Sequence, residues 1–142
     1  MTGTLLDIED MRHELAGTYL NVRVALQIKQ LRLARGWSQE ELARRAGIHQ
    51  PQIANLESTR WKSWPQVETL EQIARAFDVS LHINFAEWSS LVTEFLNNSD
   101  IPTPADFEHD PVFQSANAEN SQTVPDSPEE RQNQKNETEK LP

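Results

Sequence analysis

Apolar side chains recur every three or four residues through much of the first hundred residues of the chain. Such spacing places them on one face of an α-helix. It predicts helices over residues 19–35, 38–46, 49–57, 65–77 and 87–96. The chain is therefore expected to be mostly α-helical, with a small core where these apolar faces meet.

Two of the predicted helices, within residues 38–58, are short and closely spaced, and local signals mark their ends. Ser38 and Glu41 match a capping box, in which the serine oxygen accepts from the Glu41 amide and the glutamate returns to the serine amide. Gly47 follows the last turn of the first helix, where a residue without Cβ adopts a positive φ at little cost. The second helix is predicted to begin at His49.

The second short helix has an uncharged outer face that is rich in amides. The residues outside its buried side are Gln50, Pro51, Gln52, Ala54 and Asn55. An ordinary solvated face is rich in Lys and Glu, whereas a Gln or Asn amide offers the donor and acceptor that match N7 and N6 of adenine. The pattern therefore predicts a base-reading helix. The alternative is a polar helix that is buried or faces a protein partner.

The first eighteen residues form an amphipathic extension. Leu5, Ile8, Met11 and Leu15 are spaced for one side of a short helix, which Gly17 is expected to end. Two interpretations stay open, a frayed acidic extension or a helix packed on the domain or on a second subunit.

Residues 79–85 alternate between apolar and polar side chains, which is the periodicity of a β-strand. A lone strand leaves its backbone donors and acceptors unpaired, so the segment needs a partner. The favoured partner is its own copy in a second subunit, with the helix over 87–96 packed on the ribbon. Pairing with residues 20–24, or continuation as a helix, are the alternatives. The candidate dimerisation residues are Leu81, Ile83, Phe85 and Trp88.

The loop after residue 57 contains two cations, Arg60 and Lys62, and two indoles, Trp61 and Trp64. Cations here predict contacts to phosphate, and an indole can lie against a sugar. The alternative is that the indoles fill the space under the next helix. A second capping-box match over residues 63–66 predicts the start of that helix.

Several of these stretches together resemble a known family. They are WSQEELA at 37–43, AGI at 46–48, LE at 56–57, VETL at 67–70 and IARAF at 73–77. In these residues the chain resembles the lambda-repressor-like helix-turn-helix domain of the Cro/XRE transcriptional regulators, over residues 22–81. The resemblance implies a five-helix bundle whose third helix enters the major groove of DNA.

The resemblance also implies roles for particular residues. Residues expected to face bases are Gln50, Pro51, Gln52 and Asn55. Residues expected to contact phosphate are Ser38, Gln39, His49, Ser58, Arg60 and Lys62. Arg32 and Glu57 match family positions that pair, so a partly buried ion pair is expected. His49 and Pro51 depart from the family's usual Ser or Thr and polar residue, which leaves open the bases that are read.

A net charge of −9 would be unfavourable for DNA binding if it were spread evenly along the chain. Residues 20–64 instead hold eight basic and three acidic side chains, whereas residues 97–142 hold three basic and ten acidic ones. Because contact with phosphate depends on local charge, the basic centre is compatible with nucleic acid.

The chain has no cysteine and only four glycines. Disulfides, thiolate zinc sites, a cysteine nucleophile and a glycine-rich phosphate loop are therefore excluded, and the four histidines are too scattered to predict a metal site. No apolar run reaches the about 18 residues of a membrane span, and the acidic N-terminus is unlike a signal peptide. We expect a cytoplasmic protein that is not an enzyme and uses no cofactor.

From residue 97 the chain is rich in Pro, Asn, Gln, Ser and Glu and lacks apolar periodicity, which predicts a disordered acidic tail. Its apolar exceptions are Ile101, Phe107, Val112 and Phe113, which could dock on a partner or on the domain. The tail is expected either to keep the chain in solution or to compete with DNA for basic residues.

The sequence thus predicts an N-terminal extension over 1–18, a helix-turn-helix DNA-binding domain over 19–78, a strand plus helix for dimerisation over 79–96, and a disordered tail over 97–142. The favoured function is a sequence-specific, dimeric regulator that represses transcription by binding double-stranded DNA. Two alternatives stay open. One is an antitoxin that autoregulates through the same domain and binds a toxin, and the other is a helix-turn-helix module for protein interaction.

Overall fold

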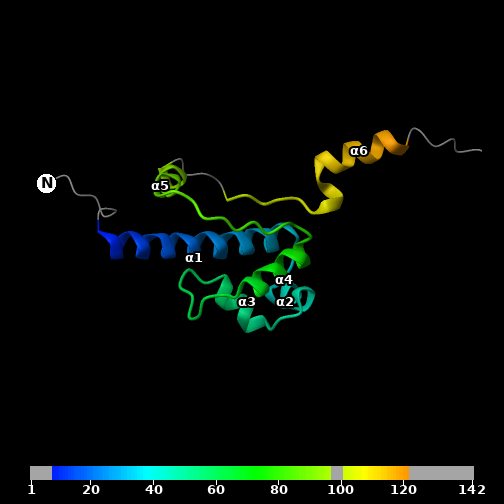
Figure 1. Cartoon of the computed structure of the whole chain (residues 1–142). Helices are drawn as coiled ribbons and strands as arrows, with labels where there is room; N and C mark the ends of the chain where they lie inside the picture. Colours follow the sequence, from blue (N-terminus) through cyan, green and yellow to red (C-terminus); the bar gives the residue numbers. More distant parts are fainter. Residues whose placement is uncertain (1–7, 97–100, 122–142) are drawn as a thin grey trace, which may run out of the picture. The chain divides into compact units, whose positions relative to one another are not determined.

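A computed structural model describes residues 8–96 and 101–121 of the chain (Figure 1). The chain divides into two compact units, the first ending at Pro104 and the second beginning at Ala105. The described residues form six α-helices and no β-strand. The prediction of a mostly helical protein is therefore confirmed, and the predicted strand is absent from these residues.

The first unit is built on one long helix, α1 (Glu9–Ala34). The predicted break at Gly17 is wrong, because the helix continues through that residue. A glycine inside a helix costs only about 0.5–1 kcal/mol relative to alanine, which the surrounding turns offset. A Cβ at position 17 would lie 3.7 Å from two ring carbons of Trp64, so the glycine also lies under a neighbouring indole. Of the predicted apolar stripe, Leu5 lies outside the described residues.

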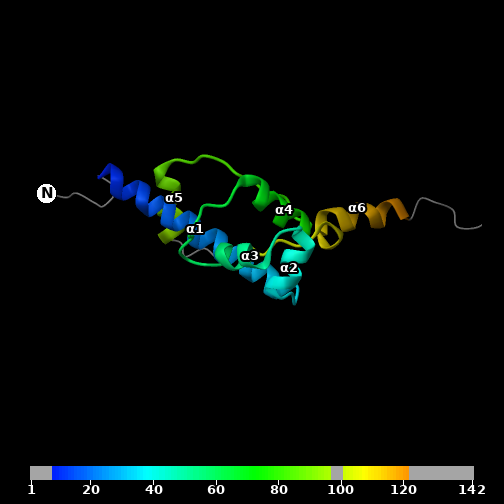
Figure 2. The same ribbon diagram turned by 90° about the horizontal axis from the view of Figure 1, so that it is seen from below.

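Three shorter helices pack at the C-terminal half of α1 (Figures 1 and 2). They are α2 (Gln39–Ala46), α3 (Gln50–Leu56) and α4 (Val67–Phe77). The helix-turn-helix bundle therefore has four helices, α1 to α4, rather than the expected five. The α4 helix begins two residues later than predicted, because Gln66 is its N-cap and the capping box over 63–66 does not form.

The ends of α2 follow the predicted signals in part. Ser38 Oγ accepts a hydrogen bond from the Glu41 amide at 3.1 Å, and Gly47 closes the helix with a φ of 69°. The return bond of the capping box is not formed. The Glu41 carboxylate instead accepts from Arg44 and Arg45, which lie one turn farther along the same helix.

The core lies where α1 meets the three short helices. Its buried apolar residues are Ile28, Leu31, Leu42, Ala43, Ala46, Ile53, Leu56, Ile73 and Phe77. Trp37 extends this core, because its ring stacks on Phe77 with the centroids 5.5 Å apart. Since α3 contributes only Ile53 and Leu56 to the core, the rest of its surface faces outward.

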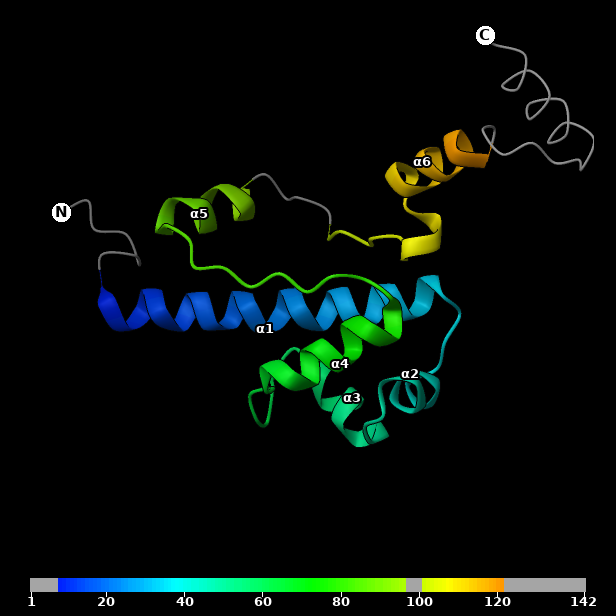
Figure 3. The same cartoon turned by 45° about the vertical axis from the view of Figure 1, so that its right-hand side comes forward.

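Residues 79–87 form an extended segment, not the predicted β-strand. The segment leaves the end of α4 and runs back toward the N-terminal half of α1, where α5 (Trp88–Leu96) follows (Figure 3). No backbone hydrogen bond joins residues 80–86 to another described part of the chain. The segment therefore lacks the pairing that defines a strand, and its residues 80–87 are all exposed.

The described part of the second unit, residues 105–121, contains helix where the sequence predicts disorder. Residues Phe107–His109 form a 3-10 turn, and α6 (Pro111–Ser121) follows. Asp106 caps the turn by accepting from the His109 amide, and the rings of Phe107 and Phe113 lie 4.8 Å apart. Composition alone did not indicate these local contacts, because it does not record which side chains meet. Residues 122–142 of the predicted tail lie outside the described residues.

Candidate nucleic-acid interface

The α3 helix is anchored in the core and presents a polar face outward. Ile53 is completely buried and Leu56 nearly so, which fixes the rotation of the helix about its axis. Pro51, Gln52 and Ala54 are exposed on the opposite side. The outward face therefore contains the amide-rich residues that the sequence singled out.

A buried ion pair connects α1 to the end of α3. Arg32 donates from Nε to Glu57 Oε1 at 2.6 Å and from Nη2 to Glu57 Oε2 at 3.1 Å. The two side chains are only 10% and 4% exposed. Arg32 Nη1 also donates to the Trp37 carbonyl at 2.8 Å. The predicted pair is thus present, and it is bidentate and almost dry, the geometry in which guanidinium and carboxylate interact most strongly.

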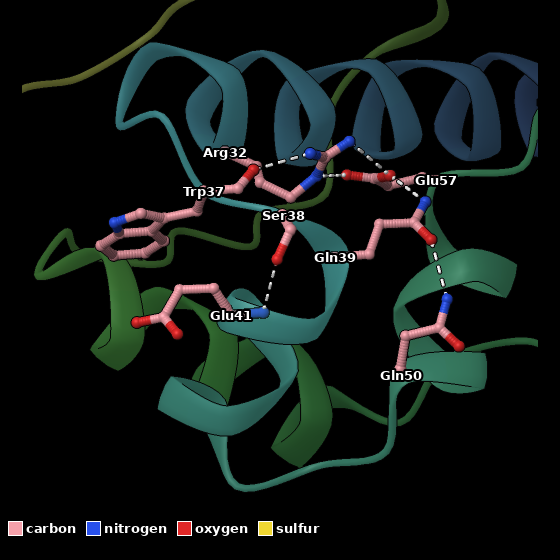
Figure 4. Close-up of polar contacts among 7 residues, drawn as sticks. All are labelled: Arg32, Trp37, Ser38, Gln39, Glu41, Gln50 and Glu57. Carbon is pink, nitrogen blue, oxygen red and sulfur yellow. Dashed lines mark hydrogen bonds and ion pairs between the residues drawn. The ribbon is translucent and has the colours of Figure 1, made fainter.

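A chain of hydrogen bonds continues from this ion pair to the start of α3 (Figure 4). Gln39 donates from Nε2 to Glu57 Oε2 at 2.6 Å, and its Oε1 accepts from Gln50 Nε2 at 2.9 Å. Gln39, predicted to contact phosphate, therefore lies between the buried carboxylate and Gln50. Sequence reasoning did not foresee this link, because the four residues are far apart along the chain.

The Gln50 side chain is held by one bond and keeps most of its hydrogen-bonding capacity. A glutamine amide has two N–H donors and an acceptor oxygen, and Gln50 gives one N–H to Gln39. A second N–H and the oxygen remain, which are the two groups needed for bidentate pairing with adenine. Gln50 is thus oriented in advance and still able to read a base.

The first turn of α3 is fixed by its own residues. Gln52 Oε1 accepts from the His49 amide at 2.9 Å, as part of a capping box between these two residues. Pro51 lies inside the first turn, where the missing N–H is not needed. His49, which is predicted to contact phosphate, is exposed at the N-cap.

Asn55 lies on α3, but its amide is engaged with the following loop. Its Oδ1 accepts from the Lys62 amide at 2.9 Å, and its Nδ2 donates to the Ser63 carbonyl at 3.2 Å. A second asparagine, Asn21 of α1, is buried and bonds to the same loop. Sequence patterns assigned no role to Asn21, although a polar residue on the inner side of a helix is a usable signal.

The segment that contains these helices matches a known family model. The helix-turn-helix model matches residues 28–83, which includes the end of α1, all of α2, α3 and α4, and part of the extended segment. Residues 28–83 are a lambda-repressor-like helix-turn-helix domain. The match supports a DNA-binding regulator of the Cro/XRE type. A search of curated proteins found no significant match to the chain.

A groove of about 1000 Å³ runs beside α3 in the helix-turn-helix domain. From α3 it is lined by residues that include Gln50, Pro51, Ala54 and Asn55. Residues 62–66 of the loop and Thr69 of α4 also line it. The groove therefore joins the predicted base-reading face to the predicted phosphate-contacting loop.

The other predicted phosphate contacts occupy the rim of the helix-turn-helix domain. Ser38 caps α2, and Ser58 Oγ is hydrogen-bonded to both the amide and the carbonyl of Arg60. The side chains of Arg60 and Lys62 are exposed. Rim cations of this kind are available to phosphate, whereas the two serines already have partners within the domain.

On α2, the guanidinium groups of Arg44 and Arg45 both donate hydrogen bonds to the Glu41 carboxylate. Arg44 donates to Glu41 at 2.6 Å and Arg45 at 2.7 Å, and these hydrogen bonds lower the pKa of Glu41 to about 2. The Arg45 guanidinium also lies 4.2 Å from the centre of the Trp37 ring. Arg44 and Arg45 are thus engaged on the flank of the helix-turn-helix domain.

The predicted dimerisation residues are exposed beyond the helix-turn-helix bundle. Leu81, Ile83, Phe85 and Trp88 are each at least 38% exposed, and Phe85 is fully exposed. Trp88 of α5 contacts α1, because its ring lies edge-on to His13 with centroids 5.2 Å apart. Tyr19 of α1 donates a hydrogen bond to Glu94 of α5. The pKa of Tyr19 is raised, chiefly by partial burial and secondly by this hydrogen bond.

Two further properties concern the described ranges 8–96 and 101–121. Nowhere in them do three His, Asp or Glu side chains form a group that could hold a metal ion. None of their helices combines the length and the apolar character that crossing a bilayer requires.

Proposed function

We propose that this protein is a dimeric, sequence-specific DNA-binding regulator that represses transcription by occupying its operator. The observation that carries the proposal is the arrangement at Gln50. A chain of bonds from the buried Arg32–Glu57 pair holds this amide at the start of α3 while its base-pairing groups remain available. An amide held in advance loses little entropy when it pairs with a base.

The α3 helix would enter the major groove with its first turn toward the base edges. Gln50 and Gln52 are the candidate readers, and Pro51 offers only an apolar surface, such as a thymine methyl prefers. Arg60 and Lys62 would contact phosphates on the flanking strand. The lining of the groove beside α3, which includes both Gln50 and Lys62, supports this arrangement.

A dimer is supported by the unpaired segment 80–86 and its exposed apolar side chains. A second copy supplies an antiparallel partner for this segment across a two-fold axis, which would satisfy backbone groups that have no backbone partner elsewhere in the described chain. Two α3 helices would then read half-sites about 34 Å apart on a palindrome. Repression would follow from occlusion of the promoter by the bound dimer.

The test is selection of binding sites from random duplex DNA, followed by titration of the selected site. Wild-type protein is expected to enrich a palindrome whose half-sites are about one helical turn apart. Gln50→Ala should lose about 1–3 kcal/mol of discrimination at one base pair per half-site. The matched control is Gln72→Ala, which removes an amide of the same type from α4 and should leave the preference unchanged. The absence of an enriched site would refute the proposal.

An antitoxin that uses the same domain for autoregulation is the second candidate. It is favoured by the exposed side chains of Phe107, Val112 and Phe113 in the second unit, which sit among carboxylates and could bind a protein partner. A stoichiometric small protein that co-purifies with the chain, and that is lost when Phe107 and Phe113 are changed to serine, would favour this candidate.

A further inference from the structure

The loop between α3 and α4 is held by the side-chain amides of two asparagines. Asn21 donates from Nδ2 to the Ser58 carbonyl at 2.9 Å and accepts at Oδ1 from the Trp61 amide at 2.9 Å. Asn55 accepts from the Lys62 amide and donates to the carbonyl of the next residue. Each side chain thus gives the irregular backbone one donor and one acceptor, the pair of partners that regular secondary structure would otherwise supply.

Packing of the two indoles adds to this support. Trp61 donates from Nε1 to the Leu56 carbonyl at 3.1 Å, and its ring lies edge-on to Trp64 with centroids 5.2 Å apart. Trp64 lies over Gly17 of α1. The loop is therefore fixed both to α1 and to α3, although it contains no helix or strand of its own.

The fixed loop places one cation at a set distance from the reading helix. Lys62 follows Trp61 directly, its backbone amide is bound by Asn55, and this exposed residue lines the same groove as Gln50. A lysine side chain is flexible, but its reach is measured from its backbone. Fixing that backbone therefore fixes which phosphate the ammonium group can meet while α3 contacts the bases.

We propose that Asn55 is a positioning residue rather than a base reader, and that it holds Lys62 in place together with Asn21. The inference rests on the proposed function. Both the oxygen and the nitrogen of Asn55 are bonded to the loop, so turning its amide toward a base would break two hydrogen bonds. Gln50 has no such conflict, because only one of its N–H groups is engaged.

The experiment measures two properties of each variant on the selected DNA site. One is the preference for that site over sites with single base-pair changes, and the other is the dependence of affinity on salt between about 50 and 200 mM. Lys62→Gln should remove one phosphate contact per subunit, two in the bound dimer, and reduce the salt slope by about 1.8, so that affinity falls about twelvefold less over this range. Asn55→Ala and Asn21→Ala should reduce the slope in the same way and leave the base preference unchanged.

Three comparisons make the test specific. Gln50→Ala should show the opposite pattern, a relaxed preference with an unchanged slope. The double variant Asn55→Ala, Lys62→Gln should have the slope of Lys62→Gln alone, because both changes remove the same contact. Asn21 is buried in α1 and does not line the groove, so an effect of Asn21→Ala on the slope cannot arise from a lost base contact. A variant that is less stable but still folded in the assay should keep both the base preference and the salt slope of the wild type.

Thermal melts establish that each variant is folded at the assay temperature. Should Asn21→Ala melt below it, Asn55→Ser, whose side chain is too short to hold both bonds, replaces it. A relaxed base preference with an unchanged slope for Asn55→Ala or Asn55→Ser would overturn the proposal. If the wild-type protein selects no site at all, the proposed function itself is wrong.

Discussion

Glu57 is the residue on which most of the interface depends, because its carboxylate receives bonds from α1 and α2 at once. Arg32 donates to both of its oxygens, and Gln39 donates to one of them. Glu57 thus both pairs with a buried charge and sets the position of the amide that holds Gln50. We therefore expect stability and the proposed base reading to be coupled at this carboxylate.

We predict that Glu57→Gln lowers the free energy of unfolding by about 3 kcal/mol, because it leaves the Arg32 charge nearly dry and without its counter-ion. The matched control is Glu71→Gln, which breaks an exposed pair with Arg75 and should cost less than about 0.5 kcal/mol. Urea denaturation of both variants measures the difference. Equal effects would show that the buried pair stabilises no more than an exposed one.

The low pKa of Glu41 predicts a contribution to stability that depends on pH. Hydrogen bonds from Arg44 and Arg45 lower this pKa from 4.5 to about 2 in the folded protein. The folded state therefore binds fewer protons, so the contribution is complete above pH 4.5 and is lost as the pH falls through about 2. Because the pair is exposed, the effect should be small and weaken with salt.

Thermal melts of Glu41→Gln between pH 7 and pH 2 test this point. The variant should melt below the wild type at neutral pH, and the two curves should converge toward about pH 2. Glu40→Gln is the control, because it removes a carboxylate from the same turn that has no ion pair within the described residues. A difference in melting temperature that is constant with pH would contradict the linkage.

At the scale of elements, two glycines with opposite backbone requirements show why helix ends are easier to predict than helix continuity. Gly47 has a φ of 69° and closes α2, as its position in the sequence predicts. Gly17 is the same residue type and was expected to end a helix, yet it lies inside α1. One difference is the contact with Trp64, which lies 3.7 Å from a Cβ at Gly17, whereas nothing lies within 4 Å at Gly47. No local signal in the sequence records that contact.

The same substitution should therefore have opposite effects at the two positions. Gly17→Ala should stabilise the protein by about 0.5–1 kcal/mol, because alanine favours the helix and its Cβ would make an ordinary contact 3.7 Å from Trp64. Gly47→Ala should destabilise it by about 1–2 kcal/mol through strain at positive φ, although the space around it is open. Chemical denaturation of the two variants measures both signs. Loss of stability in Gly17→Ala would mean that the Trp64 contact is tighter than an alanine allows.

The extended segment 79–87 shows that side-chain periodicity and strand formation are separate properties. Its residues alternate between apolar and polar in the sequence, but a strand exists only where backbone groups are paired. Within the described part of the chain no partner is present for residues 80–86. Sequence periodicity predicts which side chains share a face, whereas the partner decides whether a strand forms.

At the scale of the whole molecule, we predict that Ile83→Glu shifts the protein from dimer to monomer. Ile83 is 62% exposed, so the change should leave the melting temperature of the monomer within a few degrees of the wild type. A charge at a self-complementary interface appears twice across the two-fold axis and repels its own copy. Sedimentation at micromolar concentration measures the association state. The control is Asn84→Glu, which adds the same charge at a neighbouring polar position.

Operator binding by the same variants provides an independent measure. Ile83→Glu should weaken binding to the full palindrome and leave binding to an isolated half-site unchanged, because each domain keeps its own α3. Monomeric wild-type protein with full affinity for the palindrome would contradict the dimer. This outcome would leave the base-reading proposal for Gln50 intact.

The sequence alone was sufficient for the helix-turn-helix core. Helical spacing, the Ser38 cap and Gly47 identified α2 and α3, and the matched positions of Arg32 and Glu57 identified the ion pair. These features depend on neighbours along the chain or on a family pattern of fixed spacing. The charge distribution likewise followed from counting residues.

Only the tertiary structure decided how the amides of the interface are used. Whether Gln39 bonds to Gln50, or Asn55 to Lys62, depends on which backbone groups meet across the bundle, and nothing in the spacing of these residues records it. The role of Asn21 was hidden for the same reason. Local patterns determine where helices form, because their hydrogen bonds are local. The partners of polar side chains are set by contacts between distant residues, which exist only after the helices have packed.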